Sequence, residues 1–551
     1  MRITGSLLAI GLAVSGALTP ATPAATETEP PAHPLSLVIV APVTAPPAVV
    51  GVLDAPTLES LTTPGGLLAT QLGQLGGREV TLAIDPMILA SIRVLGRNAP
   101  TAATSWLTRL ADAPNDTFAL QWADANPAAS LHAAGVVLDA PALTIDPTLF
   151  APEGETTPDV ASGDPVIPAL PTQDDLVAWD YTHASIAWPA DHTLTETDFA
   201  GLEQHGFNAA IVNSADIPRT PIKSPHVAFG AIDGIVSHDI ASSLLRATIA
   251  APTEEAWALA FEALTDTLAQ LSESGERVLA ATLGRIDPAS PLRMSQTLDA
   301  LNAIDWVTLA PLDAVFEQPA VSSSFEPAET SDDRASTMES LARIETDVIT
   351  FSRIIDEPAP LLSTRRAKLL ALLGAGWELD DGDWAAAAQE YLADSASILG
   401  AVTIQDSSTI NLLAESGPFP VTVRNNLAHA VTVYITVQPD RPILQVKDFR
   451  VELKIPANTQ AKALVPVQVV ANGHLGTTVS LSAFDRTPIA TPTRVELNVQ
   501  AGWETPVTII MVSLVGLMLL AGIWRTVRSR ARAAAARTNP AGSATDPGSH
   551  E

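Results

Sequence analysis

The stretch LSLVIVAPV, from Leu35 to Val43, decides the fold of the first half of the chain. Its residues are apolar except for one serine, which is typical of a strand buried on both faces. Similar short stretches recur as far as Leu309, with helical patterns between several of them, such as Glu254 to Ser274. This alternation predicts a parallel sheet covered by helices. With about eight strands, the sequence favours a complete or distorted β/α barrel, of the kind found in glycosidases and deacetylases, over an open doubly wound sheet.

Individual elements follow from the same patterns. We predict a helical stretch from Thr57 to Leu75, which leads to a strand from Glu79 to Ile84. Two further strands are predicted from Thr117 to Trp122 and from His226 to Ile232. These limits matter because they place particular side chains at the ends of strands.

The period of the hydrophobic pattern changes at about Ile410. Apolar and polar residues then alternate with a period of two, as in VTVRNNLAHAVTVYITV from Val421 to Val437, and turn residues separate the runs. Short strands at regular spacing with turns between them predict an all-β domain, a β-sandwich of immunoglobulin-like (Ig-like) architecture. The absence of a Cys and Trp core signature does not oppose this, because many sandwich domains lack it.

The run PVTIIMVSLVGLMLLAGIW, from Pro506 to Trp524, carries no charge and is long enough to cross a bilayer as one C-terminal transmembrane helix. Five arginines follow it, beginning with Arg525, whereas Glu504 precedes it. The positive-inside rule therefore places the C-terminus in the cytoplasm and everything before the span outside the cell membrane. A buried core helix is the alternative, but the arginine-rich tail offers such a helix nothing to pack into.

The first residues have the layout of a secretory signal. Arg2 precedes an apolar core, SLLAIGLAVSGAL, and small residues follow up to Ala25. An uncleaved N-terminal anchor is the weaker alternative, and it leaves the predicted topology unchanged. The sequence thus predicts the following organisation: signal peptide 1–25, linker 26–34, β/α barrel-like domain 35–318, loop 319–335, helical cap or bridge 336–405, Ig-like β-sandwich 406–502, transmembrane helix 506–524 and cytoplasmic basic tail 525–551.

Composition narrows the compartment and the partners. The net charge is −31, which disfavours nucleic acid and other anionic polymers as ligands. We interpret this acidity first as solubility outside the cell. The chain has no cysteine, which excludes disulfides, thiolate metal sites and thiol nucleophiles. An exported protein without cysteine fits a bacterial envelope better than a eukaryotic secretory pathway.

Several side chains are placed where the reactive groups of a β/α barrel lie, at the carboxyl ends of strands. Carboxylates beside aromatic faces suit a sugar site, with one acid to protonate the leaving oxygen and a second as base or nucleophile. We name Asp85 and Asp124 as candidate catalytic residues. Capping of turns and helices, or packing in the core, is the alternative for each residue. The candidates for ligand binding are Trp122, Trp188, Asp191 and Asp233, and Asp216 occupies a similar position.

Other chemistries find no support in the sequence. No pair of histidines has the HxxH or HxxxH spacing of a metal-dependent deacetylase, and we expect neither a metal site nor a cofactor. The neighbouring residues Asp191 and His192 would diverge on a strand, as would His238 and Asp239. There is no GxSxG, no phosphate-binding loop and no GxGxxG fingerprint.

Several motifs are distributed along the chain: Gly65-Gly66-Leu67, Ile84-Asp85-Pro86, Trp122-Ala-Asp124, the helix containing Trp106-Leu107, and the stretch from VTVRNNLAHAVTV to VPVQVVANG. In these motifs the chain resembles a family of uncharacterised single-pass envelope proteins of actinobacteria. The resemblance covers most of the chain before the span, and it implies a place near cell-wall assembly because the gene in that family usually lies beside the lipid II flippase gene. Family members tend to carry a second acid where this chain has Asn126, which puts a two-carboxylate mechanism at that loop in doubt.

Two functions remain. The first is a non-catalytic envelope protein that binds a glycan or a protein partner near peptidoglycan assembly, and we favour it. The second is a wall-carbohydrate hydrolase that uses Asp85 and Asp124, which requires a carboxylate separation of about 5 Å for retention or about 6.5 to 9.5 Å for inversion. The sequence names neither the ligand nor the oligomeric state.

Overall fold

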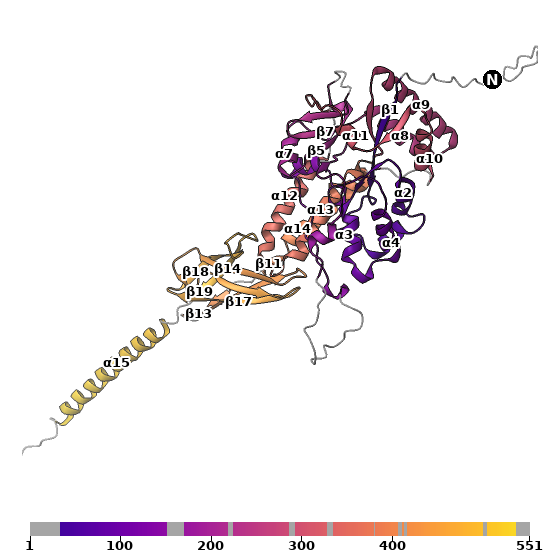
Figure 1. The fold of residues 1–551 in the computed structure, drawn as a ribbon. Helices are drawn as coiled ribbons and strands as arrows, with labels where there is room; N and C mark the ends of the chain where they lie inside the picture. Colours follow the sequence, from indigo (N-terminus) through magenta and orange to yellow (C-terminus); the bar gives the residue numbers. More distant parts are fainter. Residues whose placement is uncertain are drawn as a thin grey trace, which may run out of the picture.

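The computed structural model describes residues 33–150, 170–218, 224–285, 292–327, 334–379, 381–405, 410–412, 416–499 and 504–535. The predicted signal peptide lies outside the described residues, as do residues 536–551 of the predicted tail. Figure 1 shows an α/β region, a β-sandwich and one long helix, α15 (Glu504–Ala535), arranged in a row in chain order.

A ten-stranded sheet organises the α/β region. Its strands are β1 (Leu35–Val43), β2 (Thr81–Ile84), β3 (Thr117–Ala119), β4 (Ile186–Ala187), β5 (Ala209–Asn213), β6 (His226–Phe229), β7 (Ile232–Ser237), β8 (Val278–Thr282), β9 (Val307–Ala310) and β10 (Val321–Ser322).

Strand β1 is the centre of this sheet. It pairs in parallel with β8 along one edge, while its other edge pairs first with β9 and then with β2. Strand β3 continues the ladder beyond β2, and β7, β5 and β4 form a second parallel ladder. One residue pair, Ser237 with Ala280, joins the two ladders. The long apolar run that opens the fold is therefore the strand on which three others are registered.

The sheet curves around a core of its own. Side chains from β1, β2, β3, β4, β5, β7, β8 and β9 meet in one buried cluster that includes Val38, Phe118 and Ile211. Among the described residues no strand ladder joins β3 to β4, and two hydrogen bonds bridge this gap: His183 N donates to Thr117 O (3.0 Å), and Thr117 N donates to Thr182 Oγ1 (3.0 Å). The mixed α/β fold is confirmed, and closure into a barrel stays a prediction.

Helices cover the outer face of the sheet. A larger core cluster, which includes the other face of β1 and Trp106, lies between strands and helices. The helices described in this region are α1 (Ala55–Thr62), α2 (Leu67–Leu75), α3 (Pro86–Val94), α4 (Thr101–Ala111), α5 (Pro127–Ala134), α6 (Gln173–Val177), α7 (Asp198–Gln204), α8 (Asp239–Ile249), α9 (Glu254–Ser274), α10 (Arg293–Asn302) and α11 (Asp313–Phe316).

Three predicted elements differ in detail from the structure. The helical stretch from Thr57 to Leu75 consists of two helices, because the chain turns sharply between them at Gly65 (φ 91°) and at Gly66, where a Cβ would lie 2.3 Å from the Ser60 carbonyl oxygen. The strand predicted from His226 to Ile232 is an antiparallel hairpin turning at Gly230 (φ 65°). The strand predicted up to Trp122 ends at Ala119.

The helical segment, α12 (Ala335–Phe351), α13 (Ala359–Leu372), η6 (Ala375–Leu379) and α14 (Asp381–Leu399), joins the α/β region to the sandwich. At one end Asn126 N donates to Leu373 O (2.7 Å), and Ala125 pairs with Gly374. At the other end Phe351 and Ile355 pack into the core of the sandwich. The segment therefore contacts both neighbours through buried residues.

The sandwich consists of two sheets that share one hydrophobic core. Their strands are β11 (Val402–Ile404), β12 (Ile410–Leu412), β13 (Ser416–Asn425), β14 (Val431–Pro439), β15 (Leu444–Val446), β16 (Val451–Ile455), β17 (Gln460–Val469), β18 (Gly473–Ser482) and β19 (Thr493–Val499). One sheet has the order β11-β13-β17-β15 and the other β12-β19-β18-β14-β16. The alternation of buried and exposed residues along β14 matches the predicted period of two, and the Ig-like assignment stays a prediction.

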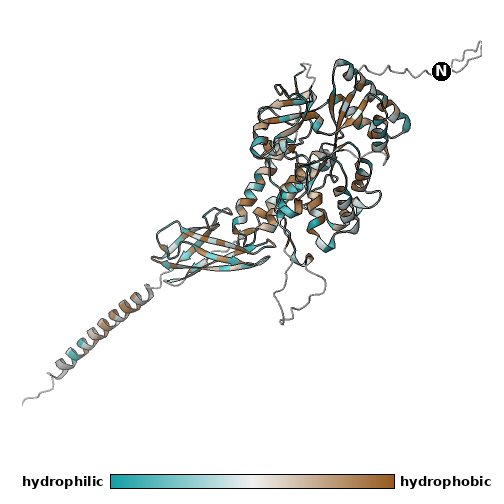
Figure 2. Ribbon diagram, viewed as in Figure 1, coloured by the Kyte–Doolittle hydropathy of each residue, from teal (hydrophilic) through white to brown (hydrophobic). Residues whose placement is uncertain are grey.

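Helix α15 contains the predicted span. Residues Val507–Arg530 form the one helix of the described residues that is long and apolar enough to cross a membrane, and its apolar stretch is not buried against the rest of the protein. Figure 2 shows its apolar run as a brown stretch that ends in hydrophilic residues. Exposed side chains such as Met518 (73% exposed) have no protein partner to cover them, which is consistent with a single-pass membrane protein.

Candidate functional site: the carboxyl edge of the sheet

The carboxyl ends of the parallel strands meet at one edge of the α/β region, which we call the mouth. This edge carries the reactive side chains in β/α barrel enzymes. The mouth contains Thr44 after β1, Asp85 after β2, the turn η2 (Trp122–Asp124) after β3, Trp188 after β4, and Gly284 and Arg285 after β8.

Asp85 is a buried acid that also begins a helix. Its Oδ1 accepts hydrogen bonds from Met87 N (2.8 Å), as the N-cap of α3, and from Ala123 N (3.0 Å) in the neighbouring turn. Burial raises its pKa to about 8, and the charge of Asp124 adds to the rise, while the backbone N–H groups oppose it. Asp85 is therefore mainly a neutral carboxylic acid at pH 7.

The turn that carries Asp124 has an uncommon backbone. Ala123 (φ 56°) and Asp124 (φ 51°) both adopt the left-handed conformation, which is unfavourable for residues other than glycine. Such conformations persist only where surrounding contacts hold them, and they are concentrated at functional sites. Here Asp85 binds the first residue of the pair, and Leu373 binds Asn126 just beyond it.

Asp124 forms a two-pronged ion pair with Arg285. Arg285 Nε donates to Asp124 Oδ2 (3.0 Å), and Nη2 donates to Oδ1 (2.9 Å), while both side chains are about nine-tenths buried. Burial raises the pKa of Asp124, and the charge and hydrogen bonds of Arg285 oppose that rise. The carboxylate is thus occupied on both oxygens.

Both tryptophans of the mouth are covered by protein. Trp188 is 5% exposed, and the Arg285 guanidinium lies 4.1 Å from the centre of its ring. Trp122 is 3% exposed, and its Nε1 has no hydrogen-bond partner within the described part of the chain. Neither indole presents an open face on which a sugar ring could stack.

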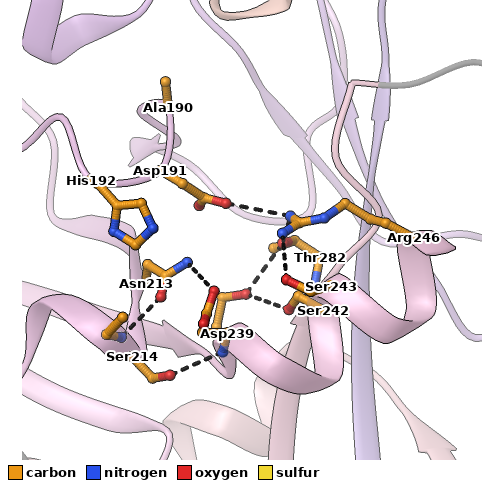
Figure 3. A network of polar contacts seen from close by, with 12 residues as sticks. Ala190, Asp191, His192, Asn213, Ser214, Asp239, Ser242, Ser243, Arg246 and Thr282 are labelled. Carbon is orange, nitrogen blue, oxygen red and sulfur yellow. Dashed lines mark hydrogen bonds and ion pairs between the residues drawn. The ribbon is translucent and has the colours of Figure 1, made fainter. Parts of the chain in front are cut away.

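A second polar network contains Asp191, His192 and Arg246 (Figure 3). The Asp191 carboxylate faces Arg246, with Nη1 3.4 Å from Oδ2, and His192 Nδ1 lies 2.8 Å from Asp216 Oδ1. Burial lowers the pKa of His192, but the hydrogen bond and charge of Asp216, with the charges of Asp191 and Asp239, outweigh it and raise the pKa. Asp191 and His192 lie in a turn rather than on a strand, and each has its own partner of opposite charge.

Asp233 does not lie at the mouth, which corrects its predicted position. Because residues 226–232 form a hairpin rather than one strand, Asp233 stands near the start of the parallel strand β7, at the opposite edge of the sheet. Its Oδ1 lies 3.0 Å from His226 Nε2.

Two cavities open at the mouth, and Arg285 lines both. The first, of about 340 Å³, lies between Trp188, Asp191, Arg246 and Thr282. The second, of about 300 Å³, contains Asp85 and Asp124, and we call it the Asp85 cavity. Residues of η6 border both cavities and α13 borders the Asp85 cavity, so the helical segment partly covers the mouth. Such volumes suit a small ligand.

The structure thus gathers Asp85, Trp122, Asp124, Trp188 and Asp191 at one edge. Sequence reasoning missed Arg285, Arg246 and Gln71, of which the last lines the Asp85 cavity. The signal for Arg285 was present, because it follows an apolar strand and a glycine just as Asp85 follows its strand. Within the described ranges no group of three or more His, Asp or Glu side chains is placed to hold a metal ion.

The fold defines the class of this protein: a mixed α/β region and a β-sandwich with one candidate membrane helix after them. The chain belongs to the family of unknown function DUF6049, whose sequence model matches residues 18–541. No curated protein matches it in sequence.

Three solved structures illustrate what the parts are similar to. The α-amylase AmyC of Thermotoga maritima aligns at 9% identity over 67% of this chain and 94% of that chain, with a TM-score of 0.39. WR4, an MSP family member of C. elegans, covers 18% of this chain and 98% of its own at 12% identity (TM-score 0.15). The PapD-like domain 7 of human CEP192 covers 18% and 84% at 12% identity (TM-score 0.14). Likenesses this weak transfer no function.

The raised pKa of Asp85 predicts a pH dependence of stability. Between about pH 4 and 8 the folded protein keeps a proton that the unfolded chain has lost, so the free energy of unfolding should fall as the pH rises. In Asp85→Asn, whose amide can still cap α3, this pH dependence should disappear. The free energy of unfolding of the variant minus that of wild type should therefore increase from pH 5 to pH 8 by on the order of a few kcal/mol. Denaturant unfolding of the full chain in detergent at several pH values measures this. Parallel profiles for the two proteins would contradict the assignment.

The ion pair predicts a second stability effect. Arg285→Met leaves the Asp124 carboxylate buried without its partner and should cost about 3–5 kcal/mol of unfolding free energy. Adding Asp124→Asn should recover most of the loss. The exposed Arg277→Met, just before β8, is the matched control and should cost under about 1 kcal/mol. If the double variant is as unstable as Arg285→Met, unpaired charge is not the cause.

Proposed function

We propose that this protein is a single-pass membrane protein of a bacterial cell envelope whose α/β region binds a glycan or protein partner near peptidoglycan assembly without cleaving it. The helical segment and the sandwich would connect this region to the span. One observation carries the non-catalytic part: the charged and aromatic side chains of the mouth are engaged with one another, through the Asp124–Arg285 ion pair and the Arg285–Trp188 contact.

The orientation is supported by charge. Arg525, Arg528 and Arg530 follow the apolar run within α15, and the positive-inside rule favours a cytoplasmic position for them. The α/β region and sandwich would then lie outside the cell membrane, where an acidic chain without cysteine is readily accommodated. The predicted signal peptide and the implied gene neighbourhood of the actinobacterial family favour the same compartment.

A hydrolase is the second candidate, and one observation favours it. Asp85, whose pKa burial raises to about 8, lines the same cavity as Asp124, as a general acid beside a second carboxylate would. Two observations weigh against it: the second carboxylate binds Arg285 through both oxygens, and Asp85 itself caps a helix. Binding therefore explains more of the mouth than catalysis does.

The topology can be tested on a clean background, because the chain has no cysteine. We expect a membrane-impermeant maleimide to label Ser416→Cys, at the exposed start of β13, in intact cells. Ser529→Cys, between two arginines of α15, should be labelled only after lysis. The matched pair differs only in position along the chain. Labelling of Ser529→Cys alone in intact cells would reverse the orientation.

Activity separates the two candidates. Incubated with purified peptidoglycan, the full chain should release no soluble fragments, and Asp85→Asn should behave identically. In cells, photo-crosslinking from the mouth should recover an envelope partner, and replacing residues 506–551 with an unrelated span and tail should disturb growth or wall labelling. Fragment release that Asp85→Asn abolishes, but that the exposed Asp112→Asn leaves intact, would favour the hydrolase. Normal growth and labelling after replacement, with no crosslinked partner, would remove the binding role.

A further inference from the structure

The Asp85 cavity has both polar and apolar walls. Its apolar lining includes Pro46 and Pro47, from the segment after β1, and Leu67 of α2, while Gly374 and Gly376 of the helical segment border it from another element. The two glycines add no side chains to the cavity. The volume, about 300 Å³, is at the small end of the range for ligand sites.

The cavity has almost no net charge, although the chain as a whole carries −31. Asp85 is mainly neutral at pH 7, and the charges of Asp124 and Arg285 cancel within their ion pair. An ionic ligand would leave water without gaining an opposite charge here, which is unfavourable. The cavity is therefore suited to an uncharged molecule.

Gln71 supplies an unused hydrogen-bond acceptor. Its side chain extends from α2 into the lining of this cavity and is 6% exposed, yet Oε1 has no partner among the described residues. Buried polar atoms are nearly always paired, so an unpaired one calls for a partner absent from the protein itself. A donor such as a hydroxyl or amide N–H would provide it.

We propose that the Asp85 cavity binds an uncharged, hydroxyl-bearing ligand the size of one sugar ring, which donates a hydrogen bond to Gln71 and packs its carbon face against the proline wall. This inference rests on the proposed binding function and narrows its ligand to the neutral residues of a glycan. A protein partner could still bind elsewhere on the molecule.

The test uses the full chain in detergent, with glucose and N-acetylglucosamine as neutral probes and glucuronic acid as the charged analogue. Saturation-transfer NMR and the shift of the thermal midpoint report binding. We expect both neutral sugars to bind saturably and glucuronic acid to bind at least about tenfold more weakly. Glycerol tests whether any polyol suffices, and we expect it to be as weak as the charged sugar.

Two variants locate the binding. Gln71→Met keeps the length of the side chain but removes the acceptor, and it should weaken sugar binding about tenfold while leaving the thermal midpoint unchanged or higher. Gly376→Ala adds a methyl 3.6 Å from Pro47 Cδ, which fits without a clash but takes room from the cavity, and it should also weaken binding. The control is Gly73→Ala, on an exposed position of α2 where a Cβ meets nothing within 4 Å.

Three outcomes would overturn the proposal. The folded protein could show no saturable binding of either neutral sugar, or Gln71→Met and Gly376→Ala could bind these sugars as tightly as wild type does. The third is that glucuronic acid binds more tightly than the neutral sugars. Any of these would leave a water-filled cavity or a different ligand class. They are distinguishable from failure of the proposed function, because growth and wall labelling after replacement of residues 506–551 do not depend on this cavity. Conversely, release of a chromophore from a nitrophenyl sugar would overturn the non-catalytic role and leave sugar binding standing.

Discussion

The mouth depends on one guanidinium. Arg285 neutralises Asp124 through two hydrogen bonds and covers the face of Trp188, and it also lies between the two cavities. Removing one partner of such a buried pair is costly because the other charge cannot be solvated. The ion pair also accounts for the strained turn at Ala123 and Asp124, because the Asp124 carboxylate binds Arg285 while Ala123 N donates to Asp85. Arg285 thereby joins the ends of β3, β4 and β8, which do not pair with one another, through side-chain contacts.

This explains how an incomplete ladder can still form an ordered edge. The ladder stops between β3 and β4, where a closed barrel would continue it. The Arg285 guanidinium, which comes from the far side of the sheet after β8, contacts both sides of that gap through Asp124 and the Trp188 carbonyl oxygen (3.2 Å). The helical segment adds a second clamp where Leu373 accepts from Asn126. The sheet is curved by its core and held at its mouth by side chains.

The sequence could predict the elements whose signal is local. Local patterns predict three such elements: the apolar run predicts β1, the alternation of apolar and polar residues predicts β14, and the uncharged run predicts α15. It could not predict what depends on distant residues. Whether Ile232 ends one strand or starts another is decided by the pairing of β7 with β5. Because this pairing is not visible in the sequence, the prediction placed Asp233 at the wrong edge of the sheet. Likewise, a strand-end aspartate looks the same in sequence whether it binds an arginine or faces a substrate, and the tertiary partners of Asp85 and Asp124 lie 38 and 161 residues away.

The distribution of charge now favours one use of the molecule over another. An acidic exterior repels the anionic groups of envelope polymers at long range, while the Asp85 cavity cancels its own charges internally. A site that binds an anionic polymer needs cations without an acidic partner. At the mouth, Arg285 and Arg246 each pair with an aspartate instead. A glycan hydrolase would need a second carboxylate that is not paired with a cation. The arrangement observed, with a neutral acid, a closed ion pair and an unused amide oxygen around a small cavity, fits recognition of an uncharged group. Such recognition needs no movement of charge and can be carried out by a rigid mouth.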